Sequence, residues 1–184
     1  MTRPRVVPHS FGEVIYLPQA QCLWLPIRKN AHTAIFEAIW SNRAQWMQVP
    51  PRDLSKYHEI KRVAMWRDPF RRLESAYSYF KTRSQLEDLP SLLLNFPDWV
   101  MEVCNQADAQ RNPHVASQTR IAKLFFDTLP EKIIRWNFPA MASELSLSEI
   151  VPRNASVRVK LDWSYHAICQ VEKEYEKDLR IWRG

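Results

Sequence analysis

The stretch LWLPIRKNAHTAIFEAIW, Leu23–Trp40, has the pattern of a strand, a short turn and a helix. The leading apolar run predicts a strand, and Ile35, Phe36 and Ile39 recur at the spacing of one helical face. The turn between them, RKNAHT at residues 28–33, contains a lysine and small or polar residues but no glycine. Because a helix N-terminus offers unpaired N–H groups and a positive dipole end, this junction predicts an anion-binding loop.

Glycine is scarce throughout the chain, which contains only Gly12 and Gly184, although glycine usually makes up roughly 7% of residues. A Walker A loop and a dinucleotide-binding GxGxxG turn both need glycines where the backbone approaches phosphate. Neither motif can be built from this sequence. An anion site at residues 28–33 must therefore use another loop geometry.

The composition predicts one globular domain over residues 1–184, with 46% hydrophobic residues and a formal net charge of +6. This charge favours phosphate-bearing or polyanionic ligands. Cys22, Cys104 and Cys169 are widely spaced, which predicts neither a disulfide framework nor a metal knuckle. No stretch resembles a signal peptide or reaches about 18 apolar residues, so we expect a soluble, cytoplasmic protein without a membrane span.

A second strand–turn–helix junction begins with KRVAMW at residues 61–66, where Asp68 and Pro69 provide a helix start. KIIRW at residues 132–136 predicts a third buried strand, and VIYLP with CLWLPI predicts a hairpin. The alternation of strands and helices predicts an α/β fold with a mainly parallel sheet flanked by helices and ligands at the carboxyl ends of the strands. Further helices are expected around residues 88–106, 117–127 and 168–182.

The helix after the second junction has two contrasting faces. Phe70, Leu73, Tyr77 and Phe80 share one face, and Arg71, Ser75 and Tyr79 share the opposite one. Arg67 and Ser75 could together offer a guanidinium and a hydroxyl to one phosphate. The alternative for these residues is an ordinary solvated basic surface.

The two junctions together resemble the nucleotide-binding motifs of sulfotransferases. RKNAHT at 28–33 is similar to the 5′-phosphosulfate loop of that family, and RDPFRRLESAY at 67–77 is similar to its 3′-phosphate motif. LSKY at 54–57, NPHVASQ at 112–118 and YEKDL at 175–179 resemble landmarks of the carbohydrate (type 2) branch. The resemblance implies a P-loop-like three-layer sandwich and the donor 3′-phosphoadenosine 5′-phosphosulfate (PAPS).

The resemblance also implies roles for individual residues. A sulfotransferase moves a sulfuryl group in line from PAPS to a hydroxyl, here of a sugar or a small molecule, and needs no metal ion. Lys29 would stabilise the charge that develops on the bridging oxygen, and the hydroxyl of Thr33 would contact the 5′-phosphate. The residues expected to bind the donor are Arg28, Lys29, Asn30, Ala31, His32, Thr33, Ala34, Arg67 and Ser75.

Three positions in residues 28–34 depart from the family pattern. Arg28, His32 and Ala34 stand where proline, glycine and a serine or threonine are common. One hydroxyl contact to phosphate is therefore lost at Ala34. His32 either donates its imidazole N–H to the anion or faces outward.

Transfer to a hydroxyl requires a base, and histidine is the usual candidate near neutral pH. His114, within NPHVASQ, is our first choice, and His58, just before the second strand, is the second. Glu59 and Asp108 are the carboxylates to consider if neither histidine acts.

Two other functions are compatible with the sequence. Eight tryptophans and a positive charge are also compatible with a nucleic-acid-binding module, although many of the aromatic residues fall at core spacing. A sulfotransferase-like protein that binds the nucleotide without transferring sulfate is the other alternative. We expect the nucleotide donor and a hydroxyl acceptor as partners, and no nucleic acid; the motifs specify no oligomeric state.

Overall fold

The computed structural model describes residues 14–82, 94–152 and 161–184. The strands are β1 (Val14–Leu17), β2 (Cys22–Leu25), β3 (Met47–Val49), β4 (Lys61–Trp66) and β5 (Lys132–Arg135). The α-helices are α1 (His32–Ser41), α2 (Pro69–Thr82), α3 (Phe96–Asn105), α4 (Gln118–Phe126), α5 (Phe138–Glu144), α6 (Tyr165–Glu174) and α7 (Glu176–Arg183). Short 3₁₀ helices are η1 (Pro18–Ala20), η2 (Pro51–Tyr57) and η3 (Asp108–Gln110).

The strands form one mixed sheet in the order β3-β1-β2-β4-β5. β2, β4 and β5 run parallel, whereas β1 is antiparallel to both β2 and β3. The α/β class and the predicted hairpin are confirmed. The expectation of a mainly parallel sheet is not confirmed, because two of the four pairings are antiparallel. The connection through η1 and Gln21, which adopts φ 46°, is too short for the crossover that a parallel pair needs.

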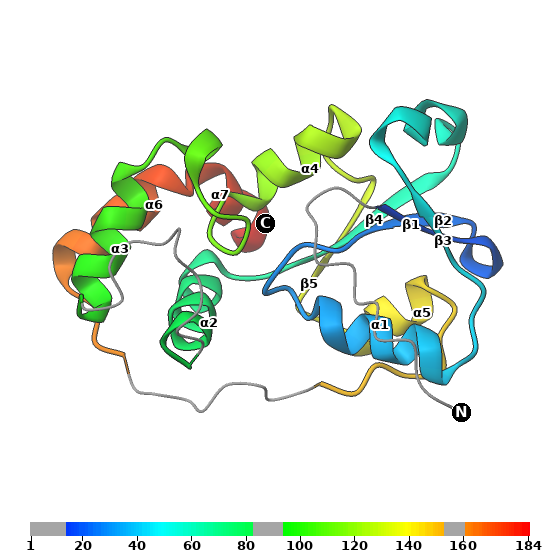
Figure 1. Ribbon diagram of the computed structural model, residues 1–184, viewed down its shortest axis with the longest axis horizontal. Coiled ribbons are helices and arrows are strands. Elements are labelled where there is room, and N and C mark those ends of the chain that lie inside the picture. Colours follow the sequence, from blue (N-terminus) through cyan, green and yellow to red (C-terminus); the bar gives the residue numbers. More distant parts are fainter. Residues whose placement is uncertain (1–13, 83–93, 153–160) are drawn as a thin grey trace.

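Helices cover both faces of the sheet (Figure 1). On one face, α1 and α5 bury apolar residues such as Ile35 and Met141 against Trp24 of β2. On the other face, α4 packs Ile121 against the apolar cluster that contains Leu23 and Trp66. All residues of β2 are buried, as expected for a strand covered on both sides.

A cluster of helices extends beside the sheet, on the left in Figure 1, where α2, α3 and α6 lie together. Leu73, Tyr77 and Phe80 of α2 pack against Trp99 of α3 and Val171 of α6. The apolar face predicted for α2 is thus confirmed. This packing orients α2 so that its first turn lies beside the end of β4.

Two helix predictions need correction. Within the stretch 88–106, the described helix is α3 alone, with Pro97 in its first turn, and residues 88–93 lie outside the described residues. The C-terminal helix is interrupted at Tyr175, which has φ −111° and separates α6 from α7. The short elements β3 and η2 were not predicted. In the described part of the chain, no helix is both long enough and apolar enough to cross a membrane.

Candidate functional site

The candidate site lies where β2 and β4 end and α1 and α2 begin. The strands pair in parallel, with Leu25 beside Ala64, so the turns that follow them meet at one edge of the sheet. The Asn30 side-chain amide donates to the carbonyl of Met65 over 2.7 Å. Arg67 Nη1 donates to the carbonyl of Lys29 over 2.9 Å. The two turns identified in the sequence are therefore in direct contact.

The first turn reverses without glycine because Lys29 and Ala31 adopt positive φ angles of 64° and 61°. Such angles cost of order 1–3 kcal/mol in residues other than glycine, so the surrounding contacts must hold the turn. His32 is the first residue of α1 and has no positive φ, which explains why this position accepts a residue with a side chain. This position therefore does not require glycine.

The N-terminus of α1 provides the backbone donors of the site. Ala31 is the N-cap residue, and it makes no side-chain capping hydrogen bond within the described residues. The N–H groups of the first helical turn have no acceptor inside the helix. Thr33, in this turn, is exposed, and its hydroxyl lies 3.5 Å from His32 Nε2. An anion at this position would satisfy backbone donors and interact with the helix dipole.

Gln118 joins the two turns from a third segment of the chain. Its side chain is fully buried, and its Oε1 accepts hydrogen bonds from Asn30 Nδ2 at 2.5 Å and from the backbone N–H of Arg67 at 3.0 Å. Its Nε2 donates to the carbonyl of Arg67 over 2.8 Å. One amide group thus fixes the relative position of both turns.

The C-terminal segment holds Gln118 in place. The buried carboxylate of Asp178 accepts hydrogen bonds from the backbone N–H groups of Gln118, at 2.7 Å, and Thr119, at 2.9 Å. Burial raises the pKa of Asp178, while the hydrogen bonds from Thr119 and Gln118 oppose that shift. The Tyr175 hydroxyl donates to the carbonyl of Val115. The sequence segments 112–118 and 175–179 therefore meet behind the site.

Arg72 is a structural member of the site that the sequence reasoning missed. It is buried, and its guanidinium donates to the carbonyls of Arg28 at 3.1 Å, Ala116 at 2.6 Å and Pro113 at 2.9 Å. Its spacing from Phe80, two i+4 steps along α2, was the signal that could have placed it on the buried face.

Arg67 brings a partly buried positive charge to the site. Burial, reinforced by the nearby charge of Arg72, lowers the pKa of Arg67 to about 10. Its guanidinium lies 4.3 Å from the ring centroid of Trp136. Among the described residues, neither Arg67 nor Arg72 forms an ion pair with a carboxylate. Since a desolvated cation is unfavourable without a counter-charge, this arrangement favours an external anion.

Ser75 and Lys29 complete the donor-binding set predicted from the sequence. Ser75 is partly exposed on α2, about 9 Å along the helix axis from its first residue. The Lys29 ammonium lies 4.4 Å from the ring centroid of Tyr79, one turn further along α2. The predicted arginine, serine and lysine thus come from the two adjoining turns and the helix that follows the second.

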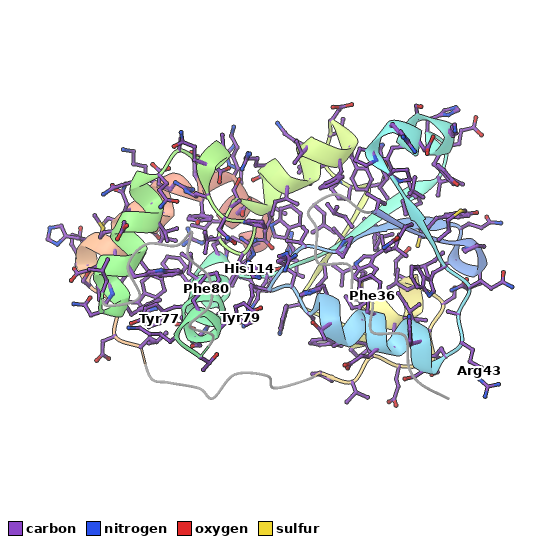
Figure 2. All side chains as sticks on the ribbon, in the orientation of Figure 1. Phe36, Arg43, Tyr77, Tyr79, Phe80 and His114 are labelled. Atoms are coloured by element: carbon purple, nitrogen blue, oxygen red, sulfur yellow. The ribbon has the colours of Figure 1, made fainter. Side chains whose placement is uncertain are left out.

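His114 lies at the side of this site, next to Tyr79 and Phe80 (Figure 2). Its ring stacks on Tyr79 with 5.2 Å between centroids and meets Phe80 edge-on at 5.3 Å. Its Nδ1 lies 2.8 Å from Asn112 Oδ1, which assigns the ring proton to Nδ1 because an amide oxygen only accepts. Nε2 then carries the lone pair and faces Arg28 Nη1 at 3.4 Å.

The surroundings of His114 strongly favour its neutral form. Burial, followed by the charges of Arg28 and Lys29, lowers the pKa of His114 to about 3. The ring is therefore uncharged at neutral pH, and a nearby negative charge would offset only the part of the pKa shift that these cations cause. A bound anion next to Arg28 and Lys29 would supply such an offset.

The other proposed bases lie elsewhere. His58 is exposed and lies directly after η2, just before the amino end of β4. The length of β4, about 17 Å, separates that end from the carboxyl end that forms the site. Glu59 is its exposed neighbour. Asp108 accepts a 2.8 Å hydrogen bond from the Ser117 backbone and fixes that loop. Of the two histidines, the structure brings only His114 to the site.

No family model, curated protein or solved structure matches this chain. Within residues 14–82, 94–152 and 161–184, no group of three or more His, Cys, Asp or Glu side chains is placed to hold a metal ion.

Proposed function

We propose that this protein is a sulfotransferase that moves a sulfuryl group from PAPS to a hydroxyl of a sugar or small-molecule acceptor. The observation that carries the proposal is the contact between the two motif-bearing turns, made by Arg67 Nη1 on the Lys29 carbonyl at 2.9 Å. One nucleotide with phosphates on both its 5′ and 3′ sides needs two adjoining anion sites. The segments 28–34 and 67–75, each a turn followed by the start of a helix, provide them after neighbouring parallel strands.

The charge distribution supports an anionic ligand of this kind. Arg67 and Arg72 are desolvated cations that lack a carboxylate partner among the described residues, and Arg28 and Lys29 are close by. Arg72 uses its donors on three carbonyls and so has a structural part. Arg67 makes one side-chain hydrogen bond within the described residues, which leaves donors for a phosphate.

The parallel strands and the helices that follow them support the same assignment. β2, β4 and β5 form a parallel core, and α1 and α2 each follow directly from a strand of that core. This is the arrangement that a P-loop-like three-layer sandwich uses to present helix N-termini to phosphate. The antiparallel strands β1 and β3 extend the sheet on the side away from β5.

In the proposed reaction, the S–O bond to the donor phosphate breaks as a bond from sulfur to the acceptor oxygen forms. The electron pair of the broken bond stays on the phosphate, where the Lys29 ammonium and the N–H groups at the start of α1 stabilise it. Arg67 and Ser75 hold the 3′-phosphate and thereby orient the donor. The acceptor proton moves to a base.

We assign the base to His114, whose unprotonated Nε2 lies 3.4 Å from Arg28 Nη1. Its depressed pKa makes it a weak base in the unliganded protein. The negative charge of the donor counters Arg28 and Lys29, so donor binding raises the pKa of His114 by the part of the shift that these cations cause, while the larger effect of burial persists. Proton acceptance is then coupled to the presence of PAPS.

The first experiment compares ligands. Isothermal titration with adenosine 3′,5′-bisphosphate and with a single-stranded oligonucleotide separates the proposal from a nucleic-acid-binding module. We expect binding of the bisphosphate. Oligonucleotide binding with a steep salt dependence, without bisphosphate binding, would refute the proposal. The burial of Trp24, Trp66 and Trp99 already reduces the number of rings available for base stacking.

The second experiment tests turnover. The protein is incubated with PAPS and a panel of sugar, alcohol and phenol acceptors, and products are examined by mass spectrometry for an added sulfo group. Transfer to any acceptor supports the enzyme. Bisphosphate binding without transfer to any acceptor in the panel would favour a nucleotide-binding homologue that has lost the activity.

A further inference from the structure

Trp136 is the last residue of the KIIRW strand pattern and belongs to none of the segments that resemble sulfotransferase motifs, yet its ring contacts Arg67. Its ring centroid lies 4.3 Å from the Arg67 guanidinium carbon, close enough for a favourable cation–π interaction. Resting on the proposed function, we propose that Trp136 is a positioning residue that holds Arg67 for a 3′-phosphate. It thereby makes the site selective for adenosine 3′,5′-bisphosphate over adenosine 5′-monophosphate.

The sheet register places the two residues together. Trp66 and Arg135 are partners at the carboxyl ends of β4 and β5, and Arg67 and Trp136 are the residues that follow them. The backbone N–H of Trp136 donates to the carbonyl of Trp66 over 2.9 Å. The ring and the guanidinium are thus carried by two strands that are hydrogen-bonded to each other up to this point.

The backbone of Trp136 is held in an uncommon conformation. Its φ is 44°, in the left-handed region that a bulky side chain rarely adopts. Such an angle persists only where surrounding contacts impose it, and it is frequent at functional sites. Here the contacts are the hydrogen bond to Trp66 and the edge-on packing of Phe138, with 5.3 Å between ring centroids. The orientation of the ring is therefore well determined.

The ring restricts Arg67 without using its hydrogen-bond donors. One donor of the guanidinium is occupied by the Lys29 carbonyl, and the face of the group is covered by Trp136. An arginine held in this way loses less conformational freedom when it binds phosphate, so each hydrogen bond contributes more affinity. A carboxylate in place of Trp136 would instead have neutralised the charge that the phosphate requires.

The proposal predicts a selective defect. Replacing Trp136 with leucine should weaken binding of adenosine 3′,5′-bisphosphate roughly tenfold, which lies within the range of a partly buried cation–π contact. Binding of adenosine 5′-monophosphate should change less than about twofold, because the 5′-phosphate contacts the turn after β2. Trp136→Phe, which retains an aromatic face, should largely restore the preference.

The experiment measures both ligands by titration calorimetry on wild type, Trp136→Leu, Trp136→Met and Trp136→Phe. Trp136→Leu and Trp136→Met both lack the aromatic ring. One of them is enough for the test, provided that its melting temperature shows that it is folded. Trp40→Leu is the matched control, since Trp40 is an exposed tryptophan near the C-terminal end of α1. It should retain the wild-type ratio of the two dissociation constants.

A double-mutant cycle distinguishes positioning from general support of the fold. In an Arg67→Ala background, adding Trp136→Leu should leave the ratio of the two affinities unchanged, because the residue through which Trp136 acts is gone. A folded ring-free variant that keeps the wild-type ratio would overturn the inference while leaving the proposed function intact. If wild type itself shows no preference for the bisphosphate over the monophosphate, the proposed function fails and the inference with it.

Discussion

The Asp178 carboxylate accepts a 2.7 Å hydrogen bond from the backbone N–H of Gln118, a residue 60 positions earlier in the chain. Gln118 in turn joins the turn after β2 to the turn after β4 through one amide group. Through Gln118 alone, α7 is thus connected to both of the turns proposed to bind phosphate. Alignment of the two turns depends on this chain of buried hydrogen bonds.

Removal of Gln118 tests the importance of that connection. Gln118→Ala leaves the backbone N–H of Arg67 without its acceptor and should lower the free energy of unfolding by about 2–4 kcal/mol. Adenosine bisphosphate affinity should fall as well. Urea denaturation gives the first quantity and calorimetry the second. Gln170→Ala, on α6, is the control and should change stability by less than about 0.5 kcal/mol; equal effects of the two substitutions would contradict the assigned connection.

Arg67 and Ser75 should contribute unequally to nucleotide binding. Arg67→Ala is expected to weaken bisphosphate binding by about 1.5–3 kcal/mol and Ser75→Ala by about 1 kcal/mol, since hydrogen bonds from a charged donor are stronger. Arg71→Ala provides a matched control, because Arg71 is exposed on the same helix and pairs with Glu74 at 2.9 Å. Unchanged affinity in folded Arg67→Ala protein would disprove the assignment of the 3′-phosphate site.

Lys29 should affect the rate more than affinity. Lys29→Ala is expected to reduce transfer roughly 100- to 1,000-fold with every acceptor, because the ammonium acts on charge that appears only as the S–O bond breaks. Bisphosphate affinity should decline modestly. Single-turnover measurements with PAPS separate the two effects, and Lys123→Ala, exposed on α4, serves as the control. An equal loss in affinity and rate would place the role of Lys29 in binding alone.

His114 should make stability depend on acidity. Its pKa is 6.5 in an ordinary setting and about 3 in the folded protein, so between these values the unfolded chain binds more protons. The contribution of neutral His114 to the free energy of unfolding is fully present above about pH 6.5. It is progressively lost as the pH falls toward 3. At pH 5 the loss is about 2 kcal/mol.

Urea denaturation at pH 7 and pH 5 measures this loss. His114→Gln should lack the His114 contribution, whereas the exposed His58→Gln should behave as wild type. The same pH dependence in wild type and His114→Gln would show that His114 is not the buried neutral histidine described here. In wild type, saturating adenosine bisphosphate should reduce the acid sensitivity, because its charge counters Arg28 and Lys29.

Because Ala31 has a positive φ, we expect glycine at this position to stabilise the protein and valine at this position to destabilise it. Ala31→Gly should raise the free energy of unfolding by about 0.5–1 kcal/mol, since relief of the left-handed conformation exceeds the added flexibility of the unfolded chain. Ala31→Val should lower it. Ala38→Gly, in the middle of α1, should lower stability by about 1 kcal/mol or more. Thermal unfolding tests all three, and destabilisation by Ala31→Gly would contradict the loop geometry.

Local patterns in the sequence were sufficient for several parts of this protein. The strands β2, β4 and β5 and the starts of α1 and α2 follow from apolar runs, helical spacing and the Asp68-Pro69 start, which act over a few residues. The same short-range information placed Lys29 and Arg67 at the ends of strands. It also predicted an anion-binding loop without glycine, but it did not specify that Lys29 and Ala31 would adopt positive φ.

Only the tertiary structure decided which distant residues complete the site and how they are charged. Arg72 directly follows Arg71 in the sequence, and charged residues of this kind are mostly exposed. Its burial follows from the packing of α2 against residues 113–116. The neutral state of His114 comes from burial together with cations of another turn. Trp136 meets Arg67 because β5 pairs with β4, and strand pairing is a long-range choice that no local pattern records. Desolvation and charge coupling depend on three-dimensional proximity, so they arise only when the chain has folded.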